Sequence, residues 1–397
     1  MDFTRELVRI PSVNPPGSCY LECADAIDVR LQAWGLDVQR LEAPGRPGRP
    51  NVLGDLTLGR PGPTVHLNGH FDVVPPGEGW TVDPFGAEVR GDRLYGRGAC
   101  DMKAGLACAA FVARCVGRSG VDLAGRIQVS GTVDEESGGL AGVGALVDAG
   151  VIGAHSVDYA IIPEPFSPHR ICVGHRGVLW SAVRALGRTA HGSMPHLGRS
   201  AIDDLVAFLH AVRRDLAPKL EKVRTEMPVE PEGSRVASIN VNGLVGGQGV
   251  VDSQSPCVAD AAEAIFDRRF LLEEDIATVR AELPEVAARL AESEPGRTYQ
   301  VEERLCVLPV QAPEDSPLLE ALEEGIQEVL GRSPDRVASP GTYDQKHFAR
   351  GGVRHCVAYG PGRLELAHQP DEWVSLHDMR RATEVMAYAL CRLLRVD

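Results

Sequence analysis

VHLNGHFDVVP, residues 65–75, begins with a short apolar run, residues 65–68, which leads into Gly69-His70; Asp72 follows, and the stretch ends at a proline. A run of this length between turn residues is typical of a buried strand. Three further apolar runs end in turn residues and are expected to be strands: residues 126–129, 159–162 and 356–359. The chain is therefore predicted to hold several short buried strands whose ends carry turns.

Helical stretches alternate with these strands. Residues 102–116 are rich in alanine, with Leu106, Ala110 and Val112 expected to face inward, and residues 139–149 are expected to form a second helix. Alternating strands and helices favour a mostly parallel open sheet with helices on both faces. In such sheets, ligands bind outside the carboxyl ends of the strands.

Acidic and imidazole side chains gather where the apolar strands end. They are, in chain order, His70, Asp72, Asp101, Glu135, Glu136, Glu164 and His368. Carboxylates gathered without a counter-charge protonate or repel one another, so this set implies a cation. Mixed imidazole and carboxylate ligands suit zinc, and also manganese, cobalt or iron. We predict two divalent ions, zinc first, with one of the paired glutamates left to act as general base.

Each of these residues also has a simpler interpretation. His70 alone could be a hydrogen-bonded structural histidine, Asp101 a helix N-cap, and Glu135-Glu136 a solvated helix start. These simpler interpretations do not explain the set as a whole, because each residue would have to lie at a strand end of the same sheet by coincidence. The metal site is therefore favoured.

The middle of the chain has a different pattern. Its expected elements, in the order strand, helix, strand, strand, helix, strand, are residues 178–186, 201–216, 236–241, 257–266, 273–290 and 299–305. The first helix is expected to bury one apolar face: Ile202, Leu205, Val206, Leu209 and Val212. This βαββαβ order predicts a small antiparallel, ferredoxin-like sheet with two helices on one side. We therefore predict a catalytic domain in two parts, residues 1–176 and 309–397, with an inserted domain at residues 177–308.

The motifs resemble a known family from ELVRIPSVNPPG at residues 6–17 to GPGRLELAHQPDEW at residues 360–373. It is the family of co-catalytic zinc amidohydrolases that includes acetylornithine deacetylase, succinyl-diaminopimelate desuccinylase, aminoacylase and carboxypeptidase G. The resemblance covers essentially the whole chain. It implies a dinuclear metal-dependent hydrolase whose inserted domain serves as lid and dimerisation domain.

The resemblance also implies a role for each ligand. Asp101 would bridge both metals, with His70 and Glu164 completing one site and Glu136 and His368 completing the other. Glu135 would be the general base. Asp72 would orient and polarise His70, the usual partner of a ligating imidazole. Family members also have a cis peptide after the bridging aspartate, here Asp101-Met102.

The family's lid histidine reaches the metal site of the neighbouring subunit and stabilises the oxyanion. The matching segment is GRTAHGSMPHLGRSAID, residues 187–203, which makes His191 the candidate and His196 the alternative. The simpler reading of either is a turn histidine that caps the following helix. If His191 acts in trans, the active form is a homodimer.

Substrate recognition is predicted from the family's D-x-R pattern. Asp267-Arg268-Arg269 makes Arg269 a carboxylate clamp, suited to its planar guanidinium, while a surface ion pair is the alternative. Two departures from the pattern are noted. The family's N-x-V-P asparagine is missing from residues 252–256. Residues 341–347, GTYDQKH, stand where many relatives have a plainer G-T-D-A. This change places Thr342 and Tyr343 where we expect a wall of the substrate pocket.

Composition sets limits on function. A net charge of −14 without a lysine or arginine cluster argues against nucleic acid. The charged N-terminus, residues 1–6, does not resemble a signal peptide and no apolar run approaches a membrane span, so we expect a cytoplasmic protein. The ten scattered cysteines are expected to be buried thiols rather than disulfides.

The expected reaction is hydrolysis of the amide bond of an N-acyl amino acid or related small amide. A dipeptidase or carboxypeptidase using the same site is the nearest alternative, and a repurposed catabolic hydrolase that releases an amine from an aromatic substrate is another. A non-catalytic binding protein that kept the fold would be expected to have lost Glu135 or a ligand, and none is lost.

Overall fold

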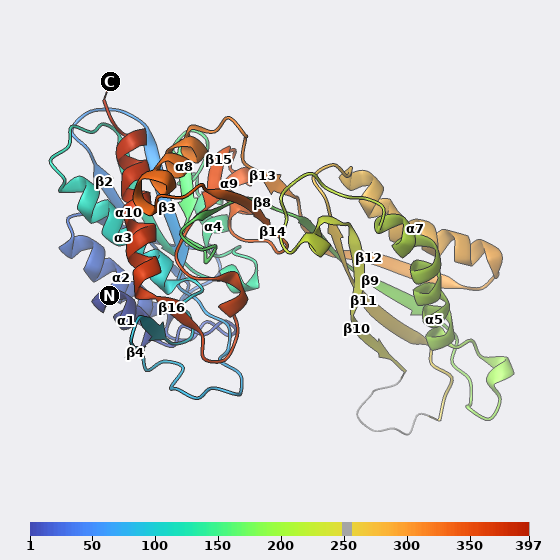
Figure 1. The fold of residues 1–397 in the computed structure, drawn as a ribbon. Helices are drawn as coiled ribbons and strands as arrows, with labels where there is room; N and C mark the ends of the chain where they lie inside the picture. The colour runs from blue at the N-terminus through green and yellow to red at the C-terminus, as the bar shows by residue number, and fades with distance from the viewer. Residues whose placement is uncertain (248–255, 397) are drawn as a thin grey trace. The chain divides into compact units, whose positions relative to one another are not determined.

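The computed structural model describes residues 1–247 and 256–396. The chain forms two compact units (Figure 1). Unit 1 comprises Met1–Gly174, Ala312–Val337 and Tyr343–Asp397, and unit 2 comprises His175–Gln311 together with the short segment Ala338–Thr342. Unit 2 is thus inserted into the chain of unit 1.

The centre of unit 1 is a sheet in which four neighbouring strands run parallel. These are β6 (Arg126–Thr132), β3 (Thr64–His70), β7 (Tyr159–Ile162) and β15 (His355–Ala358), in that spatial order. They coincide with the four apolar runs from which strands were predicted, except that Tyr359 lies just beyond the end of β15. Antiparallel strands continue the sheet on both sides: β2 (Pro50–Thr57), β1 (Asp37–Glu42) and β8 (Arg170–His175). The predicted mostly parallel α/β sheet is confirmed.

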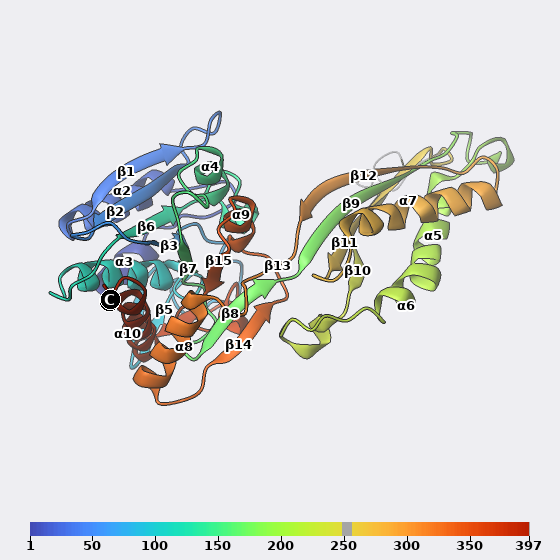
Figure 2. The same cartoon turned by 90° about the horizontal axis from the view of Figure 1, so that it is seen from above.

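Helices cover both faces of this sheet (Figure 2). Side chains of β7 and β15 alternate between two apolar clusters, because successive residues of a strand point to opposite faces. Ile161 and Val357 belong to the larger cluster, whereas Ala160 and Cys356 belong to the smaller one. The larger cluster includes residues of α1 (Asp2–Val8), α2 (Tyr20–Ala33), α3 (Lys103–Gly117), α8 (Pro317–Leu330) and α10 (Leu376–Leu393). The smaller cluster includes residues of α4 (Val143–Asp148) and α9 (Gln345–Arg350).

Helix α3 lies close to the carboxyl ends of the strands because small residues permit it. Its predicted inward residues Leu106, Ala110 and Val112 are buried. A side chain at Gly105 would place its Cβ 2.0 Å from the main-chain oxygen of Pro163, which follows β7. Glycine at this position therefore lets the start of α3 approach the end of β7, where the candidate ligands lie.

Unit 2 contains a four-stranded antiparallel sheet in the order β10-β11-β9-β12. The strands are β9 (Gly177–Leu186), β10 (Ser238–Gly246), β11 (Ala261–Phe270) and β12 (Thr298–Val307). The helices are α5 (Ala201–Ala211), α6 (Ala217–Leu220) and α7 (Ile276–Ser293). The predicted βαββαβ order is confirmed.

The first helix of unit 2 differs from its prediction in two ways. After α5, residues Val212–Leu216 form a π-helical turn. Pro218 has no N–H to donate to the carbonyl four residues before it, which disfavours a continuous α-helix here. The predicted inward face is also partly wrong: Leu205 and Val212 are buried, but Ile202 and Val206 are 42% and 57% exposed.

The remaining strands are short. Near the unit boundaries lie β13 (Val310–Gln311) and β14 (Asp335–Ser339). A separate sheet of unit 1 has the order β16-β5-β4, with β16 at Trp373–Ser375, β5 at Arg93–Tyr95 and β4 at Glu88–Arg90. No helix of the described residues is long and apolar enough to cross a membrane. All ten cysteines lie in the described part of the chain, and none forms a disulfide.

Candidate metal centre

The predicted ligands lie at the carboxyl ends of the parallel strands or in loops that reach that edge. His70 is the last residue of β3, and Glu164 follows β7 by two residues. Glu136 lies in a short 3-10 helix, Glu135–Ser137, after β6. Asp101 immediately precedes the N-cap of α3, and His368 lies in the loop before β16.

The structure brings these side chains together in two groups that share one residue. His70, Asp101 and Glu164 form one group, and Asp101, Glu136 and His368 form the other, with the potential ligand atoms of each group within 4.8 Å of one another. Asp101 Oδ1 is 3.2 Å from His70 Nε2, while Asp101 Oδ2 is 3.4 Å from His368 Nε2. The two oxygens of one carboxylate therefore face two different histidines.

The second and third carboxylates complete the groups at similar distances. Glu164 Oε1 is 3.9 Å from His70 Nε2, and Glu136 Oε2 is 3.1 Å from His368 Nε2. Of the paired glutamates, Glu136 belongs to a ligand group and Glu135 does not. This placement separates the two residues into the two roles that the resemblance implies.

The electrostatics of the cluster favour a cation. Burial, together with the nearby charge of Asp101, raises the pKa of Glu164 and raises that of Glu136 to about 7. Hydrogen bonds to Asp101 and Glu136 raise the pKa of His368 to about 10. Within the described residues, no lysine or arginine forms an ion pair with Asp101, Glu136 or Glu164. Among the described residues, histidines are therefore the cationic partners of these carboxylates, and a divalent ion would relieve the repulsion between them.

The residues present fit two divalent ions. Each group offers one imidazole nitrogen and two carboxylates, a donor set suited to zinc, manganese or cobalt. His70 Nδ1 lies 3.0 Å from the main-chain oxygen of Asp72, and this carbonyl can only accept a hydrogen bond. His70 therefore carries a proton on Nδ1 and presents Nε2 to the centre, as a ligand must.

The carboxylate of Asp72 has a wider role than the predicted partner of His70. It lies 3.5 Å from His70 Nδ1, but its hydrogen bonds come from other groups. Asn14 Nδ2 donates to it at 2.8 Å, and the backbone N–H groups of Glu135 and Glu136 donate at 3.2 Å each. Asp72 therefore fixes the turn that carries the candidate base and a candidate ligand.

Glu135 has an unpredicted partner. Its Oε1 is 3.4 Å from Nζ of Lys346, and both side chains are largely buried. Lys346 is the second residue of α9 and lies within residues 341–347, where the sequence predicted a substrate wall. The ammonium group holds the Glu135 carboxylate beside the ligand groups, and no pattern within the sequence predicted this contact.

The simpler interpretation of Asp101 is not supported. The N-cap of α3 is Met102, and no side chain caps this helix. The Asp101-Met102 peptide bond is cis, as the resemblance implied. The carboxylate of Asp101 is thus directed to the two histidines rather than to the helix end.

His191 lies in unit 2 and is exposed. Its Nδ1 accepts a hydrogen bond from the backbone N–H of Ser193 at 3.1 Å, and Ser193 Oγ lies 2.7 Å away. Because a backbone N–H can only donate, neutral His191 carries its proton on Nε2. His196 is also exposed, and the side chain that caps α5 is Ser200, so neither histidine caps this helix.

The predicted substrate residues have other contacts. Arg269 pairs with Asp267 through Nε at 2.7 Å and Nη2 at 3.0 Å, which is the ion pair weighed as the alternative. Thr342 lies in the segment of the chain that belongs to unit 2. Tyr343 is only 5% exposed, and its hydroxyl is 2.7 Å from Gln345 Oε1. The prediction that Tyr343 forms a substrate wall is therefore wrong, because its ring fills the apolar core. Residues 252–255, where the missing asparagine was noted, lie outside the described residues.

A mostly parallel sheet with imidazole and carboxylate groups gathered at the carboxyl ends of its strands defines the architecture of a metal-dependent hydrolase. Comparison with known proteins shows the family to which the chain belongs. The family model of peptidase family M20/M25/M40 matches residues 66–392. The chain belongs to this family and is a metal-dependent amidohydrolase, which confirms the predicted enzyme class.

Individual relatives agree with this assignment. Succinyl-diaminopimelate desuccinylase of Methylobacterium radiotolerans is 30% identical over 404 residues, covering 98% of this chain and 95% of the relative. Human carnosine dipeptidase 1 shares the fold with a TM-score of 0.77 at 20% identity, covering 99% and 95% of the two chains. A dinuclear metal-binding peptidase of Bacillus subtilis has a TM-score of 0.71 at 16% identity, covering 99% and 97%.

Proposed function

We propose that this protein uses two divalent ions to hydrolyse the amide bond of an N-acyl amino acid or a related small amide. Zinc is the metal that we expect first. One observation carries the proposal. The two oxygens of Asp101 face two separate groups of ligand atoms, each with one histidine and one glutamate. His70 and Glu164 would hold one ion, Glu136 and His368 the other, and Asp101 both.

Bound divalent ions supply two effects: they lower the pKa of water toward about 7 and polarise a carbonyl oxygen. The chain supplies the rest. Glu135 accepts the proton of the attacking water and returns it to the nitrogen of the leaving amine. Lys346, 3.4 Å from Glu135 Oε1, keeps that carboxylate in place during both transfers.

His191 is proposed to donate its Nε2 hydrogen to the oxyanion formed at the active site of a partner subunit. Its hydrogen bond from the Ser193 N–H leaves Nε2 as the donor, the tautomer that an oxyanion requires. The arrangement in trans follows the family resemblance. It makes a homodimer the active form.

Two elements of unit 2 support a homodimer. Strand β10 is at the edge of its sheet and exposes Leu244 and Val245 by 65% and 54%. The neighbouring helix α5 exposes Ile202 and Val206. Ile202 is adjacent to this strand, since its Cγ1 would lie 3.1 Å from a Cβ built at Gly246. A strand that has no neighbour on one side among the described residues, beside exposed apolar side chains, is suited to bind a second copy of the chain.

The N-acyl amino acid substrate class is supported by the desuccinylase relative, which matches nearly the whole chain at 30% identity. The test is to load the purified protein with zinc, manganese or cobalt and measure amine release from N-succinyl, N-acetyl and N-formyl amino acids and from dipeptides. The expected result is turnover of an N-acyl substrate that Glu135→Gln abolishes while the metal content stays the same.

Preferential turnover of dipeptides would instead assign the peptidase alternative. A metal-loaded protein that cleaves none of these amides would contradict the proposal as a whole. Full activity with fewer than one ion per chain, measured by elemental analysis, would also contradict it.

A further inference from the structure

A buried ion pair lies beneath the metal centre in unit 1. Arg97 Nη1 is 2.5 Å from Glu372 Oε2, and the two residues are 2% and 1% exposed. They are far apart in the chain but adjacent in space, because β5 and β16 pair with Tyr95 opposite Trp373. No sequence pattern predicted a role for either residue.

Glu372 holds the loop that carries Asp101. Its second oxygen, Oε1, accepts hydrogen bonds from the backbone N–H of Cys100 at 2.8 Å and of Asp101 at 3.0 Å. The carboxylate thus fixes the main chain of the shared ligand through two adjacent peptide groups.

Arg97 holds the loop that carries His368. Its guanidinium donates to the main-chain oxygens of His368 at 3.3 Å, Gln369 at 3.2 Å and Pro76 at 3.1 Å. His368 has a φ of 63°, in the left-handed region that only glycine adopts readily. A conformation of this kind persists only when surrounding contacts enforce it, and the planar five-donor fork of arginine can hold several carbonyls at once.

A buried ion pair is weak evidence of a stabilising role, because removing two charges from water offsets most of their attraction. The contacts of this pair are instead with the two loops that carry candidate ligands. Its arrangement resembles the outer hydrogen bonds that orient metal ligands, whose loss lowers metal affinity by about 10-fold to 100-fold.

We propose that Arg97 and Glu372 are positioning residues that set the affinity of the ion held by Asp101, Glu136 and His368. Neither touches substrate. Both loops that they hold contribute to this ligand group, whereas only Asp101 belongs to the group of His70 and Glu164. The inference rests on the proposed dinuclear site, and it predicts that disrupting the pair weakens one ion more than the other.

The test compares Glu372→Gln and Arg97→Lys with a matched control in unit 2. There, Arg268 is equally buried at 2% exposure and pairs with Glu282 through Nε at 2.8 Å. Arg268 also pairs with Glu274, so Glu282→Gln removes one carboxylate from a largely buried ion-pair network that contacts no candidate metal ligand. Ions per chain and their dissociation constants are measured by titrating metal-free protein in competition with a chelator, alongside thermal unfolding.

The expected result is that wild type binds two ions and that each unit 1 variant binds one of them about 10-fold to 100-fold more weakly. The Glu282→Gln control keeps both affinities, even if its unfolding temperature falls. At limiting metal kcat falls in the unit 1 variants with KM little changed, and excess metal restores it. If both folded unit 1 variants bind the two ions as tightly as wild type, the inference is overturned.

Two variants protect the test against misfolding. Arg97→Lys keeps the positive charge and loses the fork, so it remains informative if Glu372→Gln does not fold. Metal binding is measured without amide turnover, so a protein that binds two ions but cleaves no amide would contradict the proposed function and leave this inference standing. A wild-type protein that binds no ions would contradict both.

Discussion

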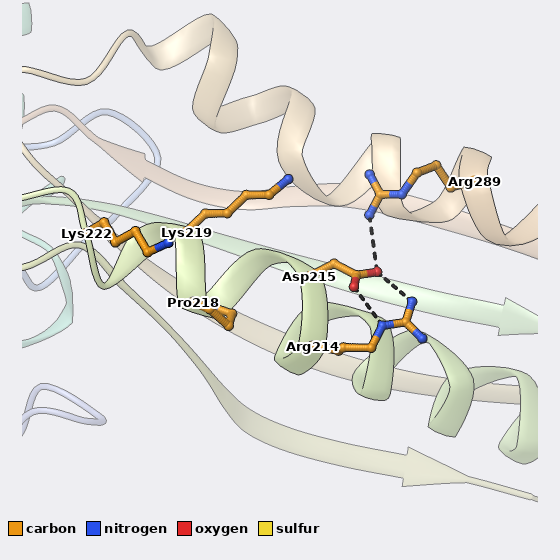
Figure 3. Close-up of a pocket in the computed structure, with 6 residues that line it drawn as sticks. All are labelled: Arg214, Asp215, Pro218, Lys219, Lys222 and Arg289. Carbon is orange, nitrogen blue, oxygen red and sulfur yellow. Dashed lines mark hydrogen bonds and ion pairs between the residues drawn. The ribbon is translucent and has the colours of Figure 1, made fainter.

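Two charged regions of this protein differ in how they gather charge. In unit 1, Asp101, Glu136 and Glu164 lie together and are largely buried, and among the described residues they form ion pairs with histidines. In unit 2, a pocket of about 470 Å³ is lined by Arg214, Asp215, Pro218, Lys219, Lys222 and Arg289. Arg214 and Arg289 both turn to Asp215, with Arg214 Nε at 2.7 Å and Arg289 Nη2 at 4.0 Å (Figure 3).

The difference lies in solvation. Lys219 and Lys222 are exposed, so water solvates their charges, and Asp215 is a ready counter-ion for both arginines. The carboxylates of unit 1 have neither advantage, and burial raises the pKa of Glu164 and Glu136. Clustered charge therefore indicates a ligand where burial removes water and counter-ions, and much less where the side chains reach solvent.

The largest effect should come from the base of the buried cluster. Glu135→Gln preserves the shape of the side chain and removes its ability to accept a proton, and the residue belongs to neither ligand group. We expect kcat to fall by about 100-fold to 10,000-fold, the usual contribution of a general base. Two ions per chain should remain bound. Normal turnover by this variant would show that the base lies elsewhere.

Removing metal should affect unit 1 nearly as strongly. Without ions the carboxylates rely on protonated histidines, so chelator-treated protein should lose activity and unfold at a lower temperature. An ion present at about 100 times its dissociation constant stabilises by about 2.7 kcal/mol, enough for a shift of several degrees. Asp101→Asn, which weakens both ligand groups, should show little further shift with chelator. An equal shift in this variant would place the bound ions elsewhere.

The sequence predicted the parts of the fold that depend on local patterns. The apolar runs near Val65, Ile127, Ile161 and Val357 became the four parallel strands, because a strand buried on both faces must be apolar along its length. His70, Glu136 and Glu164, at or just after the ends of three of these strands, lie close together because parallel strands end at one edge. These predictions needed no knowledge of distant contacts.

Other features depend on contacts with residues elsewhere in the fold, which local sequence patterns do not specify. Ile202 and Val206 have the spacing of a core face, but α5 packs through Leu205 and Phe208, which leaves them exposed. Tyr343 looked like an insertion in a binding loop, yet its ring lies in the core. Lys346 beside Glu135 and the pair of Arg97 with Glu372 join residues more than two hundred positions apart. No local pattern encodes such contacts.

The cost of placing a charge in the core can also be tested at His66 in β3. It is fully buried, and burial lowers its pKa from 6.5 to about 4. Between these values the unfolded chain binds more protons than the folded protein, so stability should fall as pH falls from 6.5 to 4. His66→Gln should make that dependence shallower by at most about 1.4 kcal/mol per pH unit. Denaturant unfolding at several pH values measures the slope, and an unchanged slope would mean that His66 is charged or solvated.

The smallest effect is expected in the pocket of unit 2. Arg289→Ala removes an exposed side chain whose nearest carboxylate, Asp215, still pairs with Arg214. Exposed ion pairs contribute little because water screens them, so the unfolding temperature should move by no more than about 2 °C. Metal affinity and kcat should stay at wild-type values, since Arg289 belongs to neither ligand group and is not among the residues proposed to act in turnover. Enzyme assays and thermal unfolding test both statements. A marked loss of activity would show that this pocket contributes to function despite its solvation. Burial would then not explain the difference between the two regions.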